Sequence, residues 1–305
     1  VRSFEHVCQK ENYKVVCMSS VGNKKELIGN FQQRNDPQFI ECVLRTICEI
    51  KLSKGGILVF FQSYEILNQY KKLLTSKLQQ IGNQNGIDID SIFYESQNQQ
   101  ENINALNGFN DYLINRRAVL CCVYNGKFSE GFDFKDDQCR IVICVSIPYR
   151  PLIDCKIKEK VEFLGVFGQK WYKNLAYRAV SQACGRAIRH AQDFGQIVLL
   201  DSRFFTMRKN LSKWIEADMK NSSFEQIIAD EWINEKIRTE QGQSVEIQLL
   251  NGEEEEVEEI CEEVTSVTDV IPTMEENQEG ENNEKLQKQN DELKEKLLLM
   301  QNQQS

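Results

Sequence analysis

Short unbroken apolar runs alternate with amphipathic stretches over the first 242 residues of this chain. Four runs are rich in β-branched or aromatic residues and predict strands buried on both faces of a parallel sheet: Gly56–Phe61, Ala118–Tyr124, Arg140–Ser146 and Gln196–Leu200. The stretches between them space their apolar residues as helices do, at Pro37–Leu52, Tyr64–Gln80, Glu101–Asn115 and Trp171–His190. Alternating strands and helices predict a doubly wound α/β sheet.

Two further amphipathic helices are expected beside this sheet, at Lys209–Asp218 and Ser223–Lys236. The segment Gly82–Gln99 is rich in Asn, Gln and Asp, which is typical of a surface insertion. We therefore predict one folded domain over residues 1–242.

The composition changes after Gly242, where the apolar periodicity gives way to acidic residues. Fourteen Asp or Glu and no Lys or Arg lie between residues 251 and 284, which predicts a disordered acidic linker over 243–284. Leu286, Leu293 and Met300 are seven apart, so residues 285–305 are expected to form a short helix, either solvated and frayed or a dimerising coiled coil. The net charge of −9 belongs to this tail, and the preceding domain is mildly basic.

Cysteine usage indicates a reducing compartment. Eleven cysteines are present, most of them in apolar runs, with no C-x-x-C pair and only two histidines, so we expect no zinc or iron–sulfur site within this chain. No apolar run reaches the roughly 18–20 residues of a membrane span, and the first residues lack the apolar core of a signal peptide. The chain begins without methionine, which suggests a fragment.

Polar residues follow three of the predicted strands, where parallel sheets bind their ligands. Ser63 and Tyr64 open a helix after the first strand, and helix-start N–H groups with a serine hydroxyl suit a phosphate. Ser63 as a plain helix N-cap is the alternative. Tyr149 and Arg150 place an aromatic ring and a cation after the third strand.

The loop after the second strand, residues 125–134, carries two glycines five residues apart among several functional groups. Glycine lets a ligand approach the backbone closely. Lys127 and Ser129 could meet phosphate, and Asp133 could accept a hydrogen bond from a ribose hydroxyl. A solvated turn is the alternative interpretation.

Gln182, Arg186 and Arg189 stand at i, i+4 and i+7, so a helix would present all three on one face. Arginine forks match phosphate oxygens and keep their charge, which makes this face a candidate polyphosphate site. An exposed basic helix end is the alternative.

The segments FFQSYEIL, GKFSEGFDF and QACGRAIRH occur in this order. They resemble motifs IV, V and VI in the second, RecA-like motor domain of XPD-type superfamily 2 helicases, which are iron–sulfur DNA helicases. They are most similar to the Fanconi anaemia group J and regulator of telomere length subgroup. Similar flanking segments, such as GQKWYKNLAYRAV and DFGQIVLLDSRF, extend the resemblance over roughly residues 15–228.

The resemblance implies roles on the nucleotide side. Arg189 would be the arginine finger on the γ-phosphate of ATP, Arg186 a second phosphate contact, and Gln182 a coupling residue beside the nucleotide. Within the motif V segment, Glu130, Gly131 and Asp133 would couple the state of ATP to the bound strand.

It also implies a grip on single-stranded or forked DNA. Ser63, Tyr64 and Tyr149 would contact the strand, with Lys127 and Ser129 near its phosphate backbone. The implied activity is 5′ to 3′ unwinding in the nucleus, driven by Mg²⁺ and ATP bound between two motor domains.

Three residues depart from the subgroup pattern. Asn125 stands where relatives have arginine, and Ser146 and Arg150 replace the glycine and second proline of G-I-P-[FY]-P. The sequence also contains no G-x-x-x-x-G-K-[ST] loop, acidic box or four-cysteine segment. In relatives these lie in an N-terminal motor domain, which would be this chain's partner and would hold the iron–sulfur cluster.

We therefore expect the C-terminal half of a helicase motor, inactive alone, with protein partners possible through the acidic tail and no membrane association. A helicase-derived scaffold that binds DNA without catalysis is the alternative from another class. A small-molecule α/β enzyme is a weaker rival, because it leaves the arginines unexplained.

Overall fold

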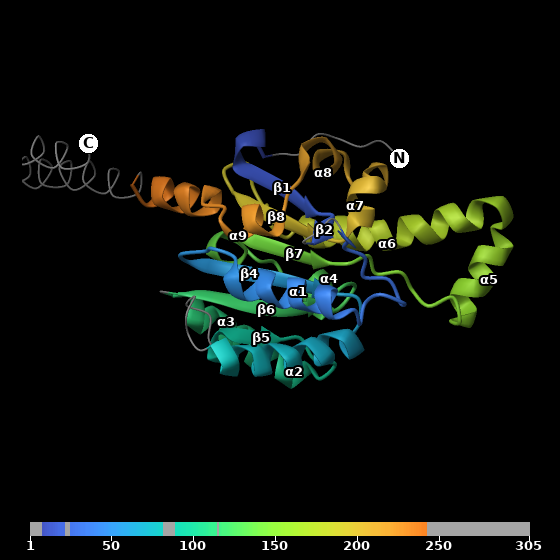
Figure 1. Ribbon diagram of the computed structural model, residues 1–305, viewed down its shortest axis with the longest axis horizontal. Coiled ribbons are helices and arrows are strands. Elements are labelled where there is room, and N and C mark those ends of the chain that lie inside the picture. The colour runs from blue at the N-terminus through green and yellow to red at the C-terminus, as the bar shows by residue number, and fades with distance from the viewer. Residues whose placement is uncertain (1–7, 22–24, 82–88, 115, 243–305) are drawn as a thin grey trace, which may run out of the picture. The chain divides into compact units, whose positions relative to one another are not determined.

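The computed structural model describes residues 8–21, 25–81, 89–114 and 116–242. Its centre is a seven-stranded sheet in the order β5-β6-β4-β7-β8-β1-β9 (Figure 1). The strands are β1 (Tyr13–Met18), β4 (Gly55–Phe61), β5 (Ile92–Tyr94), β6 (Arg117–Val123), β7 (Ile141–Val145), β8 (Gly195–Leu200) and β9 (Met219–Asn221). Every neighbouring pair is parallel, which confirms the predicted parallel α/β sheet. A separate antiparallel pair joins β2 (Ser20–Val21) and β3 (Lys25–Glu26).

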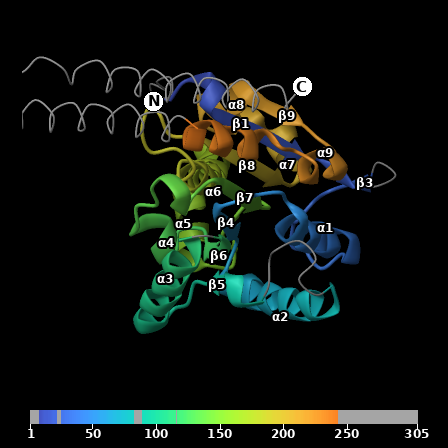
Figure 2. The same cartoon turned by 90° about the vertical axis from the view of Figure 1, so that its left-hand side faces the viewer.

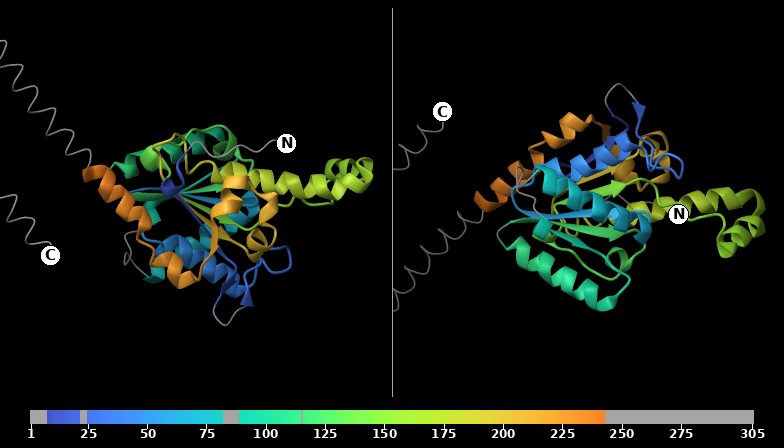
Figure 3. Two further views of the ribbon diagram at one scale, coloured as in Figure 1. Left: turned by 90° about the horizontal axis from the view of Figure 1, so that it is seen from above. Right: turned by 60° about the horizontal axis from the view of Figure 1, so that its bottom comes forward.

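Helices cover both faces of the sheet (Figures 2 and 3). One face packs against α1 (Pro37–Glu49), α2 (Tyr64–Ile81), α9 (Phe224–Ile228) and a helix over residues 232–242. The other packs against α3 (Gln99–Leu113), α6 (Gly168–Cys184), α7 (Ser202–Thr206) and α8 (Lys213–Asp218). The two cores take alternate residues of each strand, as the period-2 geometry of a strand requires. In β4, for example, Val59 faces the first core and Phe60 the second.

The four predicted strands are confirmed to within one residue at each end, but the sheet is wider than expected. β1, β5 and β9 were not predicted, because each is short or partly polar. β5 lies inside Gly82–Gln99, so the interpretation of that whole segment as an insertion is wrong; residues 82–88 lie outside the described part of the chain. The helix predicted over Ser223–Lys236 is broken at residues 229–231, where Asp230 caps the following helix by accepting from the Trp232 amide (3.1 Å).

A helical arm projects from the body of the domain (Figure 1). It consists of α5 (Cys155–Phe163), which was not predicted, and the N-terminal part of α6. Ile153, Phe163 and Val166 on this arm are each more than four-fifths exposed. The apolar pattern failed there because these side chains do not contribute to either core.

The chain divides into two units, Val1–Gly242 and Gln243–Ser305. The predicted acidic linker, 243–284, and the predicted helix, 285–305, lie outside the described residues. None of the described helices combines the length and the apolarity needed to cross a membrane.

Candidate functional site

The predicted site residues fall into two groups on opposite edges of the sheet. Ser63, Lys127 and Tyr149 follow the carboxyl ends of β4, β6 and β7, whereas Arg186 and Arg189 precede the amino end of β8. All these strands are parallel, so the two groups lie at opposite edges. Residues 124–140 connect them, because they lead from the carboxyl end of β6 to the amino end of β7.

The helix carrying the motif VI residues is shorter than predicted. α6 ends at Cys184, so only Gln182 of the three residues is helical, and the prediction of one helical face is wrong. Beyond Gly185 the chain tightens into i→i−3 turns, in which the Arg186 amide donates to Ala183 O (3.0 Å). These tight turns release the following residues from the helix.

The three side chains nevertheless converge on one segment, residues 129–134. Gln182 Nε2 donates to Ser129 O (3.1 Å). The two terminal nitrogens of Arg186 donate to Phe132 O and Ser129 O, and Arg189 Nε donates to Phe134 O (3.3 Å). Motif VI therefore holds motif V through a series of backbone carbonyls.

Arg186 is the buried member of this clamp. The residue is 8% exposed, and burial lowers the pKa of its guanidinium, with Arg189 as a second cause. The group stays protonated, since arginine titrates far above neutral pH. Its Nε and the neighbouring Ser129 Oγ are buried without a hydrogen-bond partner in the described part of the chain. Arg186 is thus built into the domain interior.

Arg189 is the accessible member. Its side chain keeps 26% of its surface exposed and forms an ion pair with Asp133 (Nε–Oδ1 2.8 Å), whose own side chain is 57% exposed. A pair this open contributes little to stability. The Arg189 guanidinium can therefore exchange its carboxylate partner for another anion without unfolding its surroundings.

The remaining motif V residues form a single helical turn. α4 spans Lys127–Glu130, and Gly131 ends it by donating from its amide to Lys127 O (2.8 Å). A Cβ on Gly131 would lie 3.0 Å from that carbonyl, so a larger residue would fit tightly. Glu130 and Gly131 are exposed and adjoin the carbonyls that the arginines hold.

At the carboxyl edge, Ser63 and Tyr64 already have partners within the domain. Ser63 Oγ accepts from the Ile66 amide (3.3 Å), which is the plain N-cap that the sequence allowed. The Tyr64 hydroxyl donates to Glu95 Oε1 (2.7 Å). The surface that a ligand can still contact here is the half-buried Tyr64 ring and the carboxyl edge of the sheet around it.

Lys127 and Ser129 differ sharply in accessibility. Lys127 is exposed, and its ammonium forms no ion pair or hydrogen bond with the described residues. Ser129 is fully buried, so contact with a DNA backbone would require its hydroxyl to become accessible. A direct DNA contact by Ser129 stays a prediction.

Tyr149 is half-buried in a small aromatic cluster. Its ring centroid lies 5.4 Å from Tyr172 and 6.5 Å from Tyr177, both on α6. Burial raises the pKa of the Tyr149 hydroxyl, which is therefore neutral at physiological pH. The cluster fixes the Tyr149 ring beside the exposed Arg150 at the carboxyl edge.

Two of the three departures from the subgroup pattern occupy left-handed backbone. Asn125 has φ 55° and Ser146 φ 58°, and Ser146 stands where the subgroup has glycine. Glycine adopts this region without the cost that a side chain brings. Hydrogen bonds offset the cost at Ser146, whose Oγ lies 2.8 Å from Gly29 O, 2.9 Å from Asp201 Oδ2 and 3.0 Å from Arg203 Nη2.

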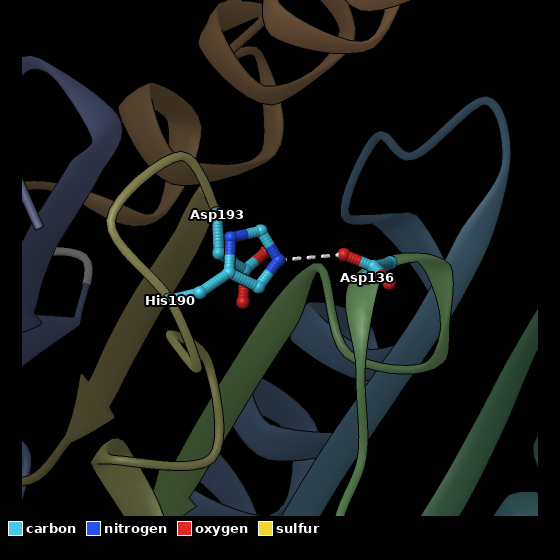
Figure 4. Close-up of side chains that lie close together, drawn as sticks. All are labelled: Asp136, His190 and Asp193. Atoms are coloured by element: carbon cyan, nitrogen blue, oxygen red, sulfur yellow. Dashed lines mark hydrogen bonds and ion pairs between the residues drawn. The ribbon is translucent and has the colours of Figure 1, made fainter.

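Asp136, His190 and Asp193 form a group whose possible metal-ligating atoms lie within 4.8 Å of one another (Figure 4). His190 Nε2 is 2.9 Å from Asp136 Oδ1, and this hydrogen bond raises the pKa of His190. The two Asp193 oxygens, however, accept from three nitrogens: Arg140 Nη1 (3.0 Å), the Phe194 amide (2.9 Å) and the Arg189 amide (2.8 Å). N–H donors already occupy the Asp193 carboxylate. The three residues are therefore better suited to fixing the Arg189 backbone than to binding a cation.

Sequence reasoning missed two buried carboxylates next to the site. Asp193 (3% exposed) holds the Arg189 backbone, and Glu95 (3% exposed) contacts both Tyr64 and the start of α4. Both lie in polar stretches between apolar runs, so periodicity gave no signal for them. An acidic residue directly after a short apolar triplet (IFY before Glu95) was the available hint.

Comparison with known proteins relates the sequence of this chain to helicases. Residues 44–218 match the family described as helicase C-terminal domain. The regulator of telomere elongation helicase 1 homolog of Aedes aegypti is 33% identical over 230 residues, covering 68% of this chain and 22% of the relative. The homolog of Drosophila willistoni is 34% identical over 231 residues, covering 70% of this chain and 22% of the relative. A structure of S. tokodaii Xpd4 aligns with 19% identity and a TM-score of 0.45 over 68% of this chain and 38% of that chain.

The chain thus spans less than a quarter of the length of these curated relatives. Their names agree with the subgroup to which the motifs pointed. The helicase C-terminal domain match covers more than half of the 305 residues, so this chain belongs to that family.

Proposed function

We propose that this chain is the C-terminal motor domain of an ATP-dependent DNA helicase and that Arg189 is its arginine finger. The observation that carries the proposal is the contrast between two arginines three residues apart. Arg186 is enclosed by the carbonyls of residues 129–134, whereas Arg189 is accessible and held only by an exposed carboxylate and one carbonyl. An accessible guanidinium on a fixed backbone suits a developing negative charge on a γ-phosphate.

The nucleotide would be Mg²⁺-bound ATP in a cleft shared with an N-terminal motor domain. When bound, Mg²⁺ would neutralise the phosphate charge, and the partner domain would supply its ligands together with the phosphate-binding loop. This chain would contribute Arg189 to the nucleotide cleft, with Asp133, Glu130 and Gly131 at the rim of that cleft. The donor set fits that task, since the Asp133 carboxylate already marks an anion position beside Arg189.

Arg186 and Gln182 would act as the coupling clamp between the two edges of the sheet. They hold residues 129–134, which belong to the same connection as Lys127 at the carboxyl edge. If a bound phosphate moved the Arg189 side chain, the movement would therefore be transmitted along one continuous segment to the DNA side. Phosphoryl transfer depends mostly on positioning and charge, so this arrangement needs no covalent catalyst in the chain.

Single-stranded DNA would bind along the carboxyl edge. Lys127 offers an exposed ammonium, without an ion pair among the described residues, for a phosphate, and the Tyr64 and Tyr149 rings offer apolar surface for bases. Ser63 would contribute through the partly exposed start of α2. We further propose unwinding in the 5′ to 3′ direction in the nucleus, with the acidic segment 243–284 available to protein partners.

The test is ATP hydrolysis by the intact helicase carrying Arg189→Ala. Loss of a finger should lower kcat by roughly 10³- to 10⁵-fold while the KM for ATP changes little. Arg178→Ala is the matched control, because Arg178 is an exposed arginine on α6 outside the clamp. Wild-type turnover by Arg189→Ala, or Arg189-dependent hydrolysis by this chain alone, would contradict the proposal.

A further inference from the structure

Glu95 is a buried carboxylate at the outer edge of the sheet, where β5 ends beside β6 (Figure 1). Its amide donates to Cys121 O (2.8 Å) and so continues the pairing of the two strands for one residue. The residue is 3% exposed. A buried acidic side chain is costly unless its oxygens are satisfied, so its partners show what it is for.

Three donors converge on this carboxylate. Oε1 accepts from the Tyr64 hydroxyl (2.7 Å) and the Lys127 amide (2.7 Å), and Oε2 accepts from the Val123 amide (2.8 Å). Burial raises the pKa of Glu95, and the hydrogen bonds oppose that shift. Because all three partners are donors, the ionised form is the one that can accept from all of them.

These partners come from the two segments assigned above to DNA binding. Tyr64 is the first residue of α2, and Lys127 is the first residue of α4. Val123 ends β6, immediately before the connection that leads into α4. One side chain therefore ties the start of the motif IV helix to the start of the motif V helix.

Gly126 makes this contact possible. A Cβ at that position would lie 2.2 Å from Glu95 Oε1 and 2.8 Å from Val123 O, both too close. The sequence suggested that this glycine lets a ligand approach the backbone. In the structure, the group that approaches it is the Glu95 carboxylate.

We propose that Glu95 is a positioning residue for single-stranded DNA: it sets the Lys127 backbone against Tyr64, so that ammonium and ring engage one strand. The inference rests on the proposed function. It assigns the relative placement of two DNA-binding residues to a residue outside the three motifs. Two consequences follow. The Tyr64 ring, rather than its hydroxyl, meets the strand, and the direction in which the Lys127 side chain leaves α4 depends on Glu95.

The test is binding of a fluorescent oligothymidylate to this chain, measured by anisotropy over a range of salt. Glu95→Gln is nearly isosteric, but its amide nitrogen must face N–H or O–H donors, so the contact at one oxygen is lost. We expect about a tenfold loss of affinity and a salt slope reduced by about one, as for loss of one phosphate contact. Lys127→Ala should give a similar loss, and the double variant should bind no more weakly than the weaker single variant.

Glu65→Gln is the matched control, an exposed glutamate beside Tyr64, and it should bind as wild type. Should Glu95→Gln fail to fold by circular dichroism, Glu95→Asp keeps the charge but cannot span both sets of donors, and the same non-additivity with Lys127→Ala is expected. Wild-type binding by a folded Glu95 variant, or losses that add with Lys127→Ala, would overturn the positioning role alone. A wild-type chain without salt-dependent binding would overturn the proposed DNA grip and this role with it.

Discussion

The division of labour between Arg186 and Arg189 predicts opposite effects on stability and activity. Replacing Arg186 by methionine keeps most of the aliphatic length but removes both Arg186 hydrogen bonds, to Ser129 O and to Phe132 O. Each hydrogen bond from a charged donor is worth roughly 1.5–3 kcal/mol, and losing the orphaned Nε recovers part of that, so we expect about 3 kcal/mol of destabilisation. The matched Arg189→Met removes an exposed ion pair and one carbonyl contact and should cost no more than about 1 kcal/mol.

Urea unfolding followed by tryptophan fluorescence and circular dichroism measures both free energies on this chain. For a domain of this size, about 3 kcal/mol corresponds to a fall in Tm of roughly 6–12 °C. Arg178→Met, on the exposed surface of α6, controls for the loss of an arginine as such. Equal destabilisation by the Arg186 and Arg189 variants, or a larger effect at Arg189, would refute the assignment of clamp and finger.

Three further predictions concern the edges of the site. Lys127→Ala should weaken single-strand binding and lower the salt slope by about one, which a salt titration of affinity measures; an unchanged slope would remove Lys127 from the phosphate contacts. Ser146→Ala should be more destabilising than Ser146→Gly by about 1 kcal/mol in urea unfolding, because alanine keeps the left-handed strain that glycine relieves; the reverse order would contradict this. His190 should titrate above 6.5 by NMR and return toward 6.5 in Asp136→Asn. Since the folded pKa is raised, its small contribution to stability should be full below 6.5 and disappear as pH rises through the folded value; a pKa unaffected by Asp136→Asn would contradict that cause.

The central sheet could be predicted because its strands are buried on both faces. Continuous β-branched runs such as ILVFF and IVICV carry that signal without reference to the rest of the chain. β5 and β9 carry no such signal, since each has three residues and gains its stability from a neighbouring strand. The arm that contains α5 was missed for a related reason: Ile153, Phe163 and Val166 are exposed and belong to neither core.

The motifs identified which residues gather at the site but not how they gather. Spacing at i, i+4 and i+7 predicted that one helical face would present Gln182, Arg186 and Arg189, but that helix ends at Cys184. In the structure they converge because each finds a carbonyl of the same crossing segment. Long-range partners of this kind, like Asp193 and Glu95, depend on tertiary contacts that no local pattern encodes.

The most direct test of the account is DNA-stimulated ATP hydrolysis by the intact helicase, comparing Arg189→Ala with Lys127→Ala. The two residues lie toward opposite edges of one sheet, so they should affect different kinetic constants. We predict that Arg189→Ala loses kcat at every DNA concentration, whereas Lys127→Ala raises the DNA concentration needed for half-maximal rate and keeps kcat. The same kinetic defect in both variants, or a DNA defect in Arg189→Ala with kcat retained, would contradict the separation of nucleotide and DNA sides.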